Sequence, residues 1–334
     1  MNNANAMAHL PGRPTVATAK SARHAWLVAA SAVLGAIATF ALQASAAPHL
    51  ARSKGARRFA ALGAWTLAGL FASAGAQAQG ATPLAGATGI AAGDRHACAL
   101  LSTGGIKCWG NNNYGKLGDG STIASSYAVD VQGVANAVDV AAGQNYGCAV
   151  TDTGGVKCWG LEPQWNHGSG SFGEVRGMYD VSGLDGTTAL KVAAGAVHAC
   201  AIVDTGTETG AIRCWGSNEY GQLGNGATSS SEYLPVQVVG ISDATAIAAR
   251  GSHTCAIVAG GVRCWGNDWF GQLGDSGTLG SSAVPVDVTL GQTALTIAAG
   301  ENHTCALLAS GGVACWGSNE IGRASCRERV SQRV

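Results

Sequence analysis

The chain contains short apolar and polar runs whose alternation predicts β-strands. The segments "HTCAIV" (253–258) and "GVRCW" (261–265) are two such runs, and the turn between them contains Gly260. Successive side chains of a strand point to opposite faces. Ile257 falls on one face of this expected hairpin and Trp265 on the other. Because both faces carry apolar side chains, we expect each hairpin to be covered on both sides.

This hairpin recurs five times with a period of about fifty residues. The first strand of each repeat contains one cysteine of the series Cys98, Cys148, Cys200, Cys255 and Cys305. The second strand contains a cysteine followed by Trp-Gly, in the series Cys108, Cys158, Cys214, Cys264 and Cys315. A period of this length is typical of solenoids and propellers. Blades arranged around an axis cover both faces of every sheet, so we expect an all-β propeller with four-stranded blades.

The consensus "GxxHTCAL…GGVxCWGxNxYGQLGDG" resembles the regulator-of-chromosome-condensation repeat over roughly residues 88–320. Its Gly-Gln-Leu-Gly element is found at 220–226 and 270–276, and at 114–120 with Lys116 in place of the glutamine. The second repeat instead has a rebuilt loop after Trp159. The resemblance is to an exported, bacterial type of this family. It implies seven-bladed propellers, so the five repeats predict an incomplete ring of four to five blades.

The N-terminal region 1–78 is predicted to direct export. Residues 59–80 form an apolar run preceded by Arg57 and Arg58, and Ala76-Gln77-Ala78 is a small-residue cleavage site. An earlier apolar stretch, 26–47, has two explanations. It is either a membrane anchor or the product of a start site placed too far upstream, in which case residues 1–50 are not translated. We favour the second, because the later run is complete as a signal.

The C-terminal residues 321–334 do not match the repeat. They contain Cys326, the one cysteine outside the five pairs, and "IGRASCRERV" resembles translated sequencing adapter. We therefore exclude 321–334 from the fold and assign the propeller to 79–320. That body has nine Lys/Arg and nineteen Asp/Glu. An acidic surface repels phosphate, so we do not expect a nucleic-acid partner.

The cysteines predict one disulfide across each hairpin. A two-residue turn at Ala259-Gly260 would place two of them opposite each other, within the reach of a disulfide, and export would supply an oxidising compartment. The expected pairs are Cys98–Cys108, Cys148–Cys158, Cys200–Cys214, Cys255–Cys264 and Cys305–Cys315.

A zinc site is the competing explanation for the His-x-Cys motif. Four repeats have a histidine there, at His96, His198, His253 and His303, but the second has Tyr146. Tyrosine is a poor substitute for a zinc-binding histidine, and ligands fifty residues apart fall on different blades. We expect neither metal nor cofactor. These histidines are interpreted as core imidazoles bonded to the backbone of the adjacent blade.

No catalytic grouping is found in the sequence, so we predict a non-catalytic, exported interaction or adhesion module with an unknown protein or cell-surface ligand. Candidate contacts are departures from the repeat: Trp269, Trp165 and His167. The family resemblance implies an alternative, guanine-nucleotide exchange on a small GTPase or chromatin binding. A third hypothesis is carbohydrate binding through exposed tryptophans, although the five tryptophans that follow cysteine are expected in the blade cores.

Overall fold

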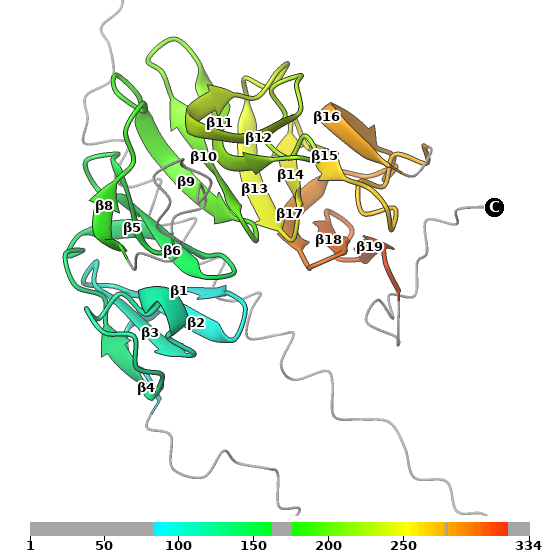
Figure 1. The fold of residues 1–334 in the computed structure, drawn as a ribbon. Coiled ribbons are helices and arrows are strands. Elements are labelled where there is room, and N and C mark those ends of the chain that lie inside the picture. The colour runs from blue at the N-terminus through cyan, green and yellow to red at the C-terminus, as the bar shows by residue number, and fades with distance from the viewer. Residues whose placement is uncertain (1–82, 162–175, 278–279, 320–334) are drawn as a thin grey trace, which may run out of the picture. The chain divides into compact units, whose positions relative to one another are not determined.

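The computed structural model describes residues 83–161, 176–277 and 280–319. All of them lie in the second of the chain's two compact units, 78–334. They form five antiparallel β-sheets, one for each repeat, so the predicted all-β propeller is confirmed (Figure 1). Four sheets have four strands each, and the fifth has three within the described residues. The predicted export region and the tail 321–334 lie outside these residues.

The first three sheets, or blades, are continuous segments of the chain. The first blade has the strands β1 (Ala87–Ala92), β2 (His96–Leu101), β3 (Ile106–Gly110) and β4 (Ser125–Asp130). The second has β5 (Ala137–Ala142), β6 (Tyr146–Thr151), β7 (Val156–Gly160) and β8 (Arg176–Asp180). The third has β9 (Thr188–Ala194), β10 (His198–Asp204), β11 (Thr209–Asn218) and β12 (Ser229–Gln237).

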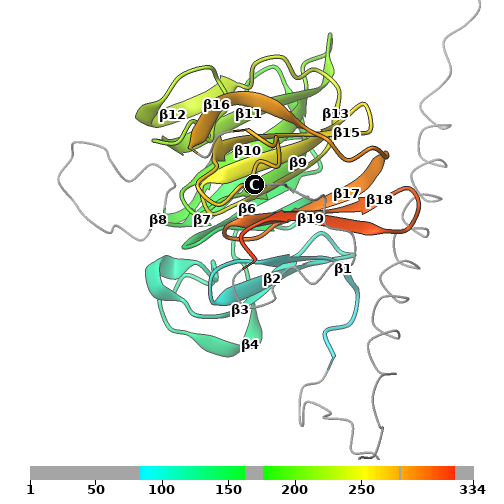
Figure 2. The same ribbon diagram turned by 90° about the vertical axis from the view of Figure 1, so that its right-hand side faces the viewer.

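The remaining two blades follow in the same order. The fourth has the strands β13 (Ala244–Arg250), β14 (His253–Val258), β15 (Gly261–Asn267) and β16 (Ser281–Val288). The fifth has β17 (Ala294–Ala299), β18 (His303–Leu308) and β19 (Val313–Gly317), which Figure 2 shows as one sheet. A short 3-10 helix, η1 (Asn113–Gly115), follows β3.

The turn at the centre of the fourth blade has the predicted length. Val258 pairs with Gly261, so Ala259 and Gly260 form a two-residue hairpin turn. Both have positive φ, 50° and 80°, which is the mirror-image turn whose twist matches that of paired strands. The turn sets the register that places Cys255 opposite Cys264.

The hydrophobic core is divided into layers between consecutive blades. In each blade one side of the central hairpin carries both cysteines, and we call it the disulfide face. The other side carries the tryptophan, and we call it the tryptophan face. Between the third and fourth blades, Cys200 and Ile212 on the disulfide face pack against Ala256 and Trp265 on the next tryptophan face. The prediction that both faces are covered is therefore confirmed at these boundaries.

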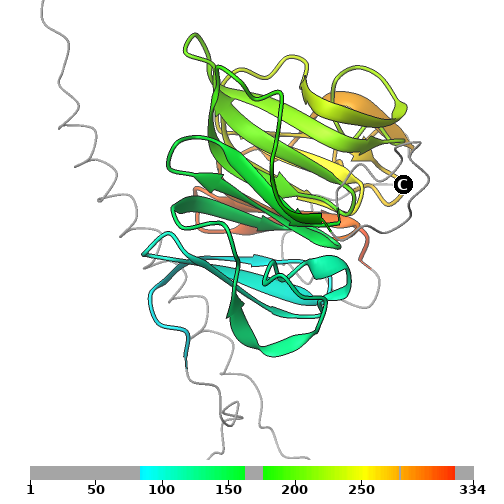
Figure 3. The same ribbon diagram turned by 60° about the vertical axis from the view of Figure 1, so that its left-hand side comes forward.

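The innermost strands of neighbouring blades lie next to one another. Strand β5 packs beside β1 and β2 (Figure 3), and β13 packs beside β9 and β17. Arg250 at the end of β13 also donates a hydrogen bond to the Ala92 carbonyl of the first blade. The count of seven blades stays a prediction. In the part of the chain that is described, no helix is long and apolar enough to cross a membrane.

Candidate functional site

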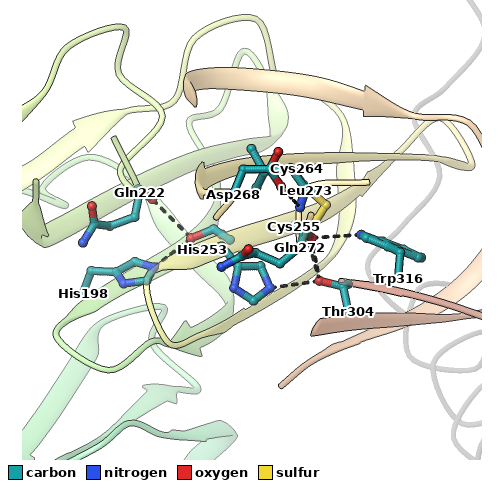
Figure 4. Close-up of a disulfide and its surroundings, with 11 residues drawn as sticks. His198, Gln222, His253, Cys255, Cys264, Asp268, Gln272, Leu273, Thr304 and Trp316 are labelled. Atoms are coloured by element: carbon teal, nitrogen blue, oxygen red, sulfur yellow. Dashed lines mark hydrogen bonds between the residues drawn. A yellow bond between two sulfur atoms is a disulfide. The ribbon is translucent and has the colours of Figure 1, made fainter. Parts of the chain in front are cut away.

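Hydrogen-bonded relays connect the third blade to the fourth and the fourth to the fifth (Figure 4). His253 Nε2 lies 2.9 Å from Thr304 Oγ1 of the next blade. Thr304 in turn donates to the Gln272 carbonyl at 3.1 Å. A hydroxyl has one proton to donate, so the imidazole donates to the hydroxyl. The same arrangement joins His198 to Thr254 at 2.8 Å.

The relay histidines are buried and neutral at physiological pH. Burial, together with a smaller effect from the nearby His253, lowers the pKa of His198 to about 3. Burial likewise lowers the pKa of His253 to about 4. An imidazole in these positions is therefore a structural donor rather than a proton-transfer group. The prediction of core imidazoles is confirmed for both, but their partner is a threonine hydroxyl and not backbone. Among the histidines of the repeats, only His253 and His303 are directly followed by threonine, and these two threonines are the partners. The sequence therefore contained a signal for the hydroxyl partners.

In the first two blades, the side chain at the position of the relay histidine forms its hydrogen bonds without a threonine. Tyr146 replaces the histidine, and the single proton of its hydroxyl is shared between two backbone carbonyls of the third blade, those of Gly195 (3.2 Å) and His198. The longer phenol side chain thus spans the distance that a histidine and a hydroxyl cover elsewhere. In the first blade, His96 Nδ1 donates to its own turn at the Asp94 carbonyl, 3.3 Å away. Tyrosine in the second repeat thus has a structural explanation.

The most exposed tryptophan that the structure describes lies on a loop of the fourth blade. Trp269 is 60% exposed, and its ring meets that of Tyr220 from the third blade edge to face, with centroids 5.9 Å apart. Phe270, the next residue, is also exposed. We call Tyr220, Trp269 and Phe270 the aromatic patch. Large aromatic side chains on a rigid scaffold are typical of binding hot spots.

The loop that holds this patch is rigid because its polar side chains bond its own backbone. Gln272 Oε1 accepts the N–H of Phe270 at 2.8 Å, and Asp268 Oδ1 accepts the N–H of Leu273 at 2.8 Å. Leu273 is fully buried and anchors the loop. The corresponding loop of the third blade, with Tyr220, has the same bonds from Gln222 and Asn218. The sequence motif therefore presents residues 219–220 and 269–270 in the same way.

Three of the five tryptophans that follow cysteine lie in the blade cores. Trp159, Trp215 and Trp265 are fully buried. Trp109 and Trp316 are half-buried. The expectation that these residues form core and not a sugar-binding platform is confirmed for the three buried ones. Among the described tryptophans, Trp269 is therefore the one with the largest exposed fraction for contact with a ligand.

The cysteines of each hairpin lie opposite each other in the strand register. Cys98 pairs with Cys108, and their sulfur atoms are 2.12 Å apart. The Cα atoms of the five pairs are 4.0–4.1 Å apart. The structure thus has the same five pairs that the hairpin geometry predicts. Among the described residues no cluster of His, Cys, Asp or Glu could hold a metal ion.

A cavity of about 320 Å³ lies between the first and second blades. Gly118, Gln132, Trp159, Gly177 and Met178 are among the residues that line it. Its lining, as far as the chain is described, contains no titratable side chain, and the Ser121 hydroxyl bonds Asp119 at 3.0 Å. The cavity therefore offers no general acid or base.

The predicted contacts are only partly described. Trp269 lies on the surface, and Tyr220 joins it although the sequence reasoning did not name Tyr220. Trp165 and His167 lie outside the described residues. Tyr220 and Trp269 lie in the same loop of consecutive repeats, next to the Gly-Gln-Leu-Gly element. The sequence could therefore have suggested that the two rings are close.

Comparison with known proteins identifies similar chains. A region of this chain is 30% identical over 173 residues to the E3 ubiquitin-protein ligase HERC2 of Homo sapiens and of Mus musculus. That region is 50% of this chain but only 4% of either relative. The crystal structure of human WBSCR16 is similar, with a TM-score of 0.59 and 25% identity, over 70% of this chain and 62% of that one.

Two sequence profiles of the regulator of chromosome condensation (RCC1) repeat match more than half of the chain between them. The first matches residues 87–116, 137–164, 190–222 and 295–322. The second matches residues 104–150, 210–257 and 259–307. These matches span all five blades of the structure. The chain therefore belongs to the family of proteins built from the regulator of chromosome condensation (RCC1) repeat.

Proposed function

We propose that this chain is an exported, non-catalytic propeller that binds a protein ligand at its aromatic patch. The observation that carries the proposal is the edge-to-face contact of Trp269 with Tyr220, which holds an exposed indole in place between two blades. A side chain that is already ordered loses little conformational entropy on binding. Loops on a rigid scaffold are also where binding residues concentrate.

Export is supported by the N-terminal sequence and by the cysteine pairs. An apolar run with a basic start and a small-residue cleavage site precedes the propeller. Five cysteine pairs at bonding distance suit an oxidising compartment. Fractionation of the producing cell, with alkylation of free thiols before lysis, tests this part. Protein found in the cytosol with all of its thiols alkylated would overturn it.

The binding site is tested by photo-crosslinking in the exporting host. A photo-reactive amino acid replaces Trp269 in the full chain, and the same replacement at Tyr127 is the matched control. Tyr127 is also aromatic, lies on β4 of the first blade, and has an exposed fraction of 81%, which is larger than that of Trp269. We expect a discrete crosslinked protein from position 269 and none from 127. Identical products from both positions would contradict the proposal.

Carbohydrate binding is the second candidate, because an exposed tryptophan is also a platform for a sugar ring. A glycan array probed with the full chain and with the Trp269→Asn variant distinguishes the two. Asparagine is the residue of the first repeat at this position, Asn113, so the loop is expected to keep its form. Array binding that Trp269→Asn abolishes would favour the sugar and overturn the protein ligand.

Nucleotide exchange on a small GTPase is the alternative suggested by membership of the RCC1 repeat family. It requires a cytosolic or nuclear chain, which the export signal predicted from the sequence opposes. Accelerated release of a labelled guanine nucleotide from a GTPase by the purified chain would favour this function over the proposed one.

A further inference from the structure

The two loops that carry the aromatic patch contain carboxylates and no basic residue. The loop between β11 and β12 has Glu219, which is exposed. The loop between β15 and β16 has Asp268 and Asp275. Neither loop contains lysine, arginine or histidine. The ionisable groups of these loops are therefore all acidic, and a region of one charge sign attracts ligands of the opposite sign.

The four basic residues of the third and fourth blades are engaged elsewhere. Arg263 pairs with Asp287 of its own blade at 2.8 Å. Arg213 and Arg250 donate to backbone carbonyls. Lys191 lies on β9, the innermost strand of the third blade. In none of these described contacts does a cation neutralise a carboxylate of the patch loops, so a ligand can supply the positive charge.

The two carboxyl groups of the fourth-blade loop repel each other. Burial raises the pKa of Asp268, and the charge of Asp275 also raises it. Both effects oppose a negative charge at Asp268. A cation beside the loop would favour the charged form of each carboxyl group and so reduce this cost. The electrostatics of the loop therefore favour a cationic ligand group over an anionic one.

The rings of the patch are arranged to receive a cation. The planes of Tyr220 and Trp269 make an angle of 82°, so the pair offers ring faces in two directions. The backbone of Trp269 is held in place, since its N–H donates to Asn267 Oδ1 at 3.1 Å. The face of an aromatic ring is negative, and the indole ring attracts cations most strongly. An ordered and exposed indole on an acidic loop therefore suits a cationic side chain.

We propose that the protein ligand places an arginine side chain against Trp269, with Glu219 as its counter-charge. This inference rests on the proposed function, because it names the group that the aromatic patch binds. The planar guanidinium of arginine stacks on an aromatic ring and can still donate hydrogen bonds to a carboxylate. The segment of the ligand that docks at the patch is therefore basic.

The first experiment repeats the photo-crosslinking from position 269 with a second substitution in the chain. Glu219→Lys is compared with Glu208→Lys, which changes the net charge by the same amount. Glu208 is exposed and lies in the turn before β11, at the opposite end of that strand from Glu219. We expect Glu219→Lys to lower the yield of the crosslinked protein by about fivefold or more, whereas Glu208→Lys leaves it unchanged. Thermal unfolding checks that both variants fold.

The second experiment measures the affinity of the full chain for two labelled peptides by fluorescence polarisation. One peptide carries several arginines among glycine and serine residues. In the other, citrulline replaces each arginine and removes its charge while keeping its shape. We expect the citrulline peptide to bind about 5- to 30-fold more weakly. Trp269→Asn should weaken binding of the arginine peptide by a similar factor, and the control Tyr127→Asn should not.

Three results would overturn this inference and leave the proposed function standing. The crosslinked protein could form in equal yield in Glu219→Lys and Glu208→Lys. The two peptides could bind with equal affinity. Trp269→Asn could bind the arginine peptide as well as Tyr127→Asn does. The failure of the proposed function has a different signature, because no discrete protein would then be crosslinked from position 269 even with Glu219 intact.

Discussion

His253 of the fourth blade donates a hydrogen bond to Thr304 of the fifth, and the two atoms are 2.9 Å apart. The threonine hydroxyl donates its own hydrogen bond to the carbonyl of Gln272 at 3.1 Å. Trp316 Nε1 donates to the same carbonyl at 2.9 Å. This relay satisfies polar groups inside an apolar layer, where an unpaired group would cost free energy. It therefore couples the packing of two blades to one hydroxyl group.

Replacing Thr304 by valine should destabilise the protein. The variant keeps the shape of the side chain but leaves the imidazole N–H of His253 without its acceptor. The expected loss in the free energy of unfolding is about 1–3 kcal/mol, measured by urea denaturation. Thr296→Val on β17 is the matched control, because Thr296 is exposed, and it should change stability by less than about 0.5 kcal/mol. Equal effects of the two variants would contradict the structural role of the relay.

Acidification should unfold the protein through the relay histidines. The pKa of His253 is about 4 in the folded state and near its ordinary value of about 6.5 in the unfolded chain. Between these values the unfolded chain binds more protons, so stability falls as pH decreases from 6.5 towards 4. His253→Gln keeps a donor for Thr304 but does not titrate. Its free energy of unfolding should depend less steeply on pH across this window, and an unchanged slope would refute the assignment.

Removal of one disulfide should lower the free energy of unfolding of the oxidised protein. We expect the double variant Cys255→Ser, Cys264→Ser to lose about 2–5 kcal/mol of unfolding free energy in oxidising buffer. Peptide mapping without reduction should find the other four links within hairpins. Links between blades, or free thiols throughout the exported protein, would refute the pairing.

Asp268→Asn should stabilise the protein at neutral pH. Burial raises the pKa of the Asp268 carboxyl, and the carboxylate of Asp275 raises it further. A raised folded-state pKa means that stability falls as pH rises from the ordinary value near 4 through the folded one. At this position the third blade has Asn218, whose Nδ2 donates to the Ala227 carbonyl at 3.0 Å. We expect a gain of about 1 kcal/mol, and a loss for the reciprocal Asn218→Asp; the opposite signs would refute this.

Alanine substitutions at two glycines with the same φ should distinguish the cost of backbone strain from the cost of a steric clash. Gly224 and Gly291 both have φ of 66°. A Cβ atom at Gly224 would lie 2.8 Å from Nε1 of Trp265, whereas at Gly291 it would meet nothing within 4 Å. Gly291→Ala should cost about 1–2 kcal/mol for the left-handed conformation. Gly224→Ala should cost about 1–3 kcal/mol more, measured by thermal unfolding. Equal losses would show that the indole gives way.

The local features of this protein follow from its sequence. Alternation and the period of fifty residues predict the strands and blades. The turn at Ala259-Gly260 predicts the register that brings Cys255 and Cys264 together. These features depend on residues that are close along the chain, and a hairpin leaves them few alternatives. Even the burial of Trp265 follows, because apolar side chains on both faces of a hairpin require a neighbour on each side.

Contacts between blades were decided only by the tertiary structure. The partner of His253 was expected to be backbone and is the hydroxyl of Thr304, 51 residues further on. The contact of Tyr220 with Trp269 was not foreseen, nor was the different exposure of Val313 and Val262. Sequence pattern assigns a side chain to a face of its own sheet. Which atom of the next blade it meets depends on how two sheets stack, and that is determined by the packing of the whole layer.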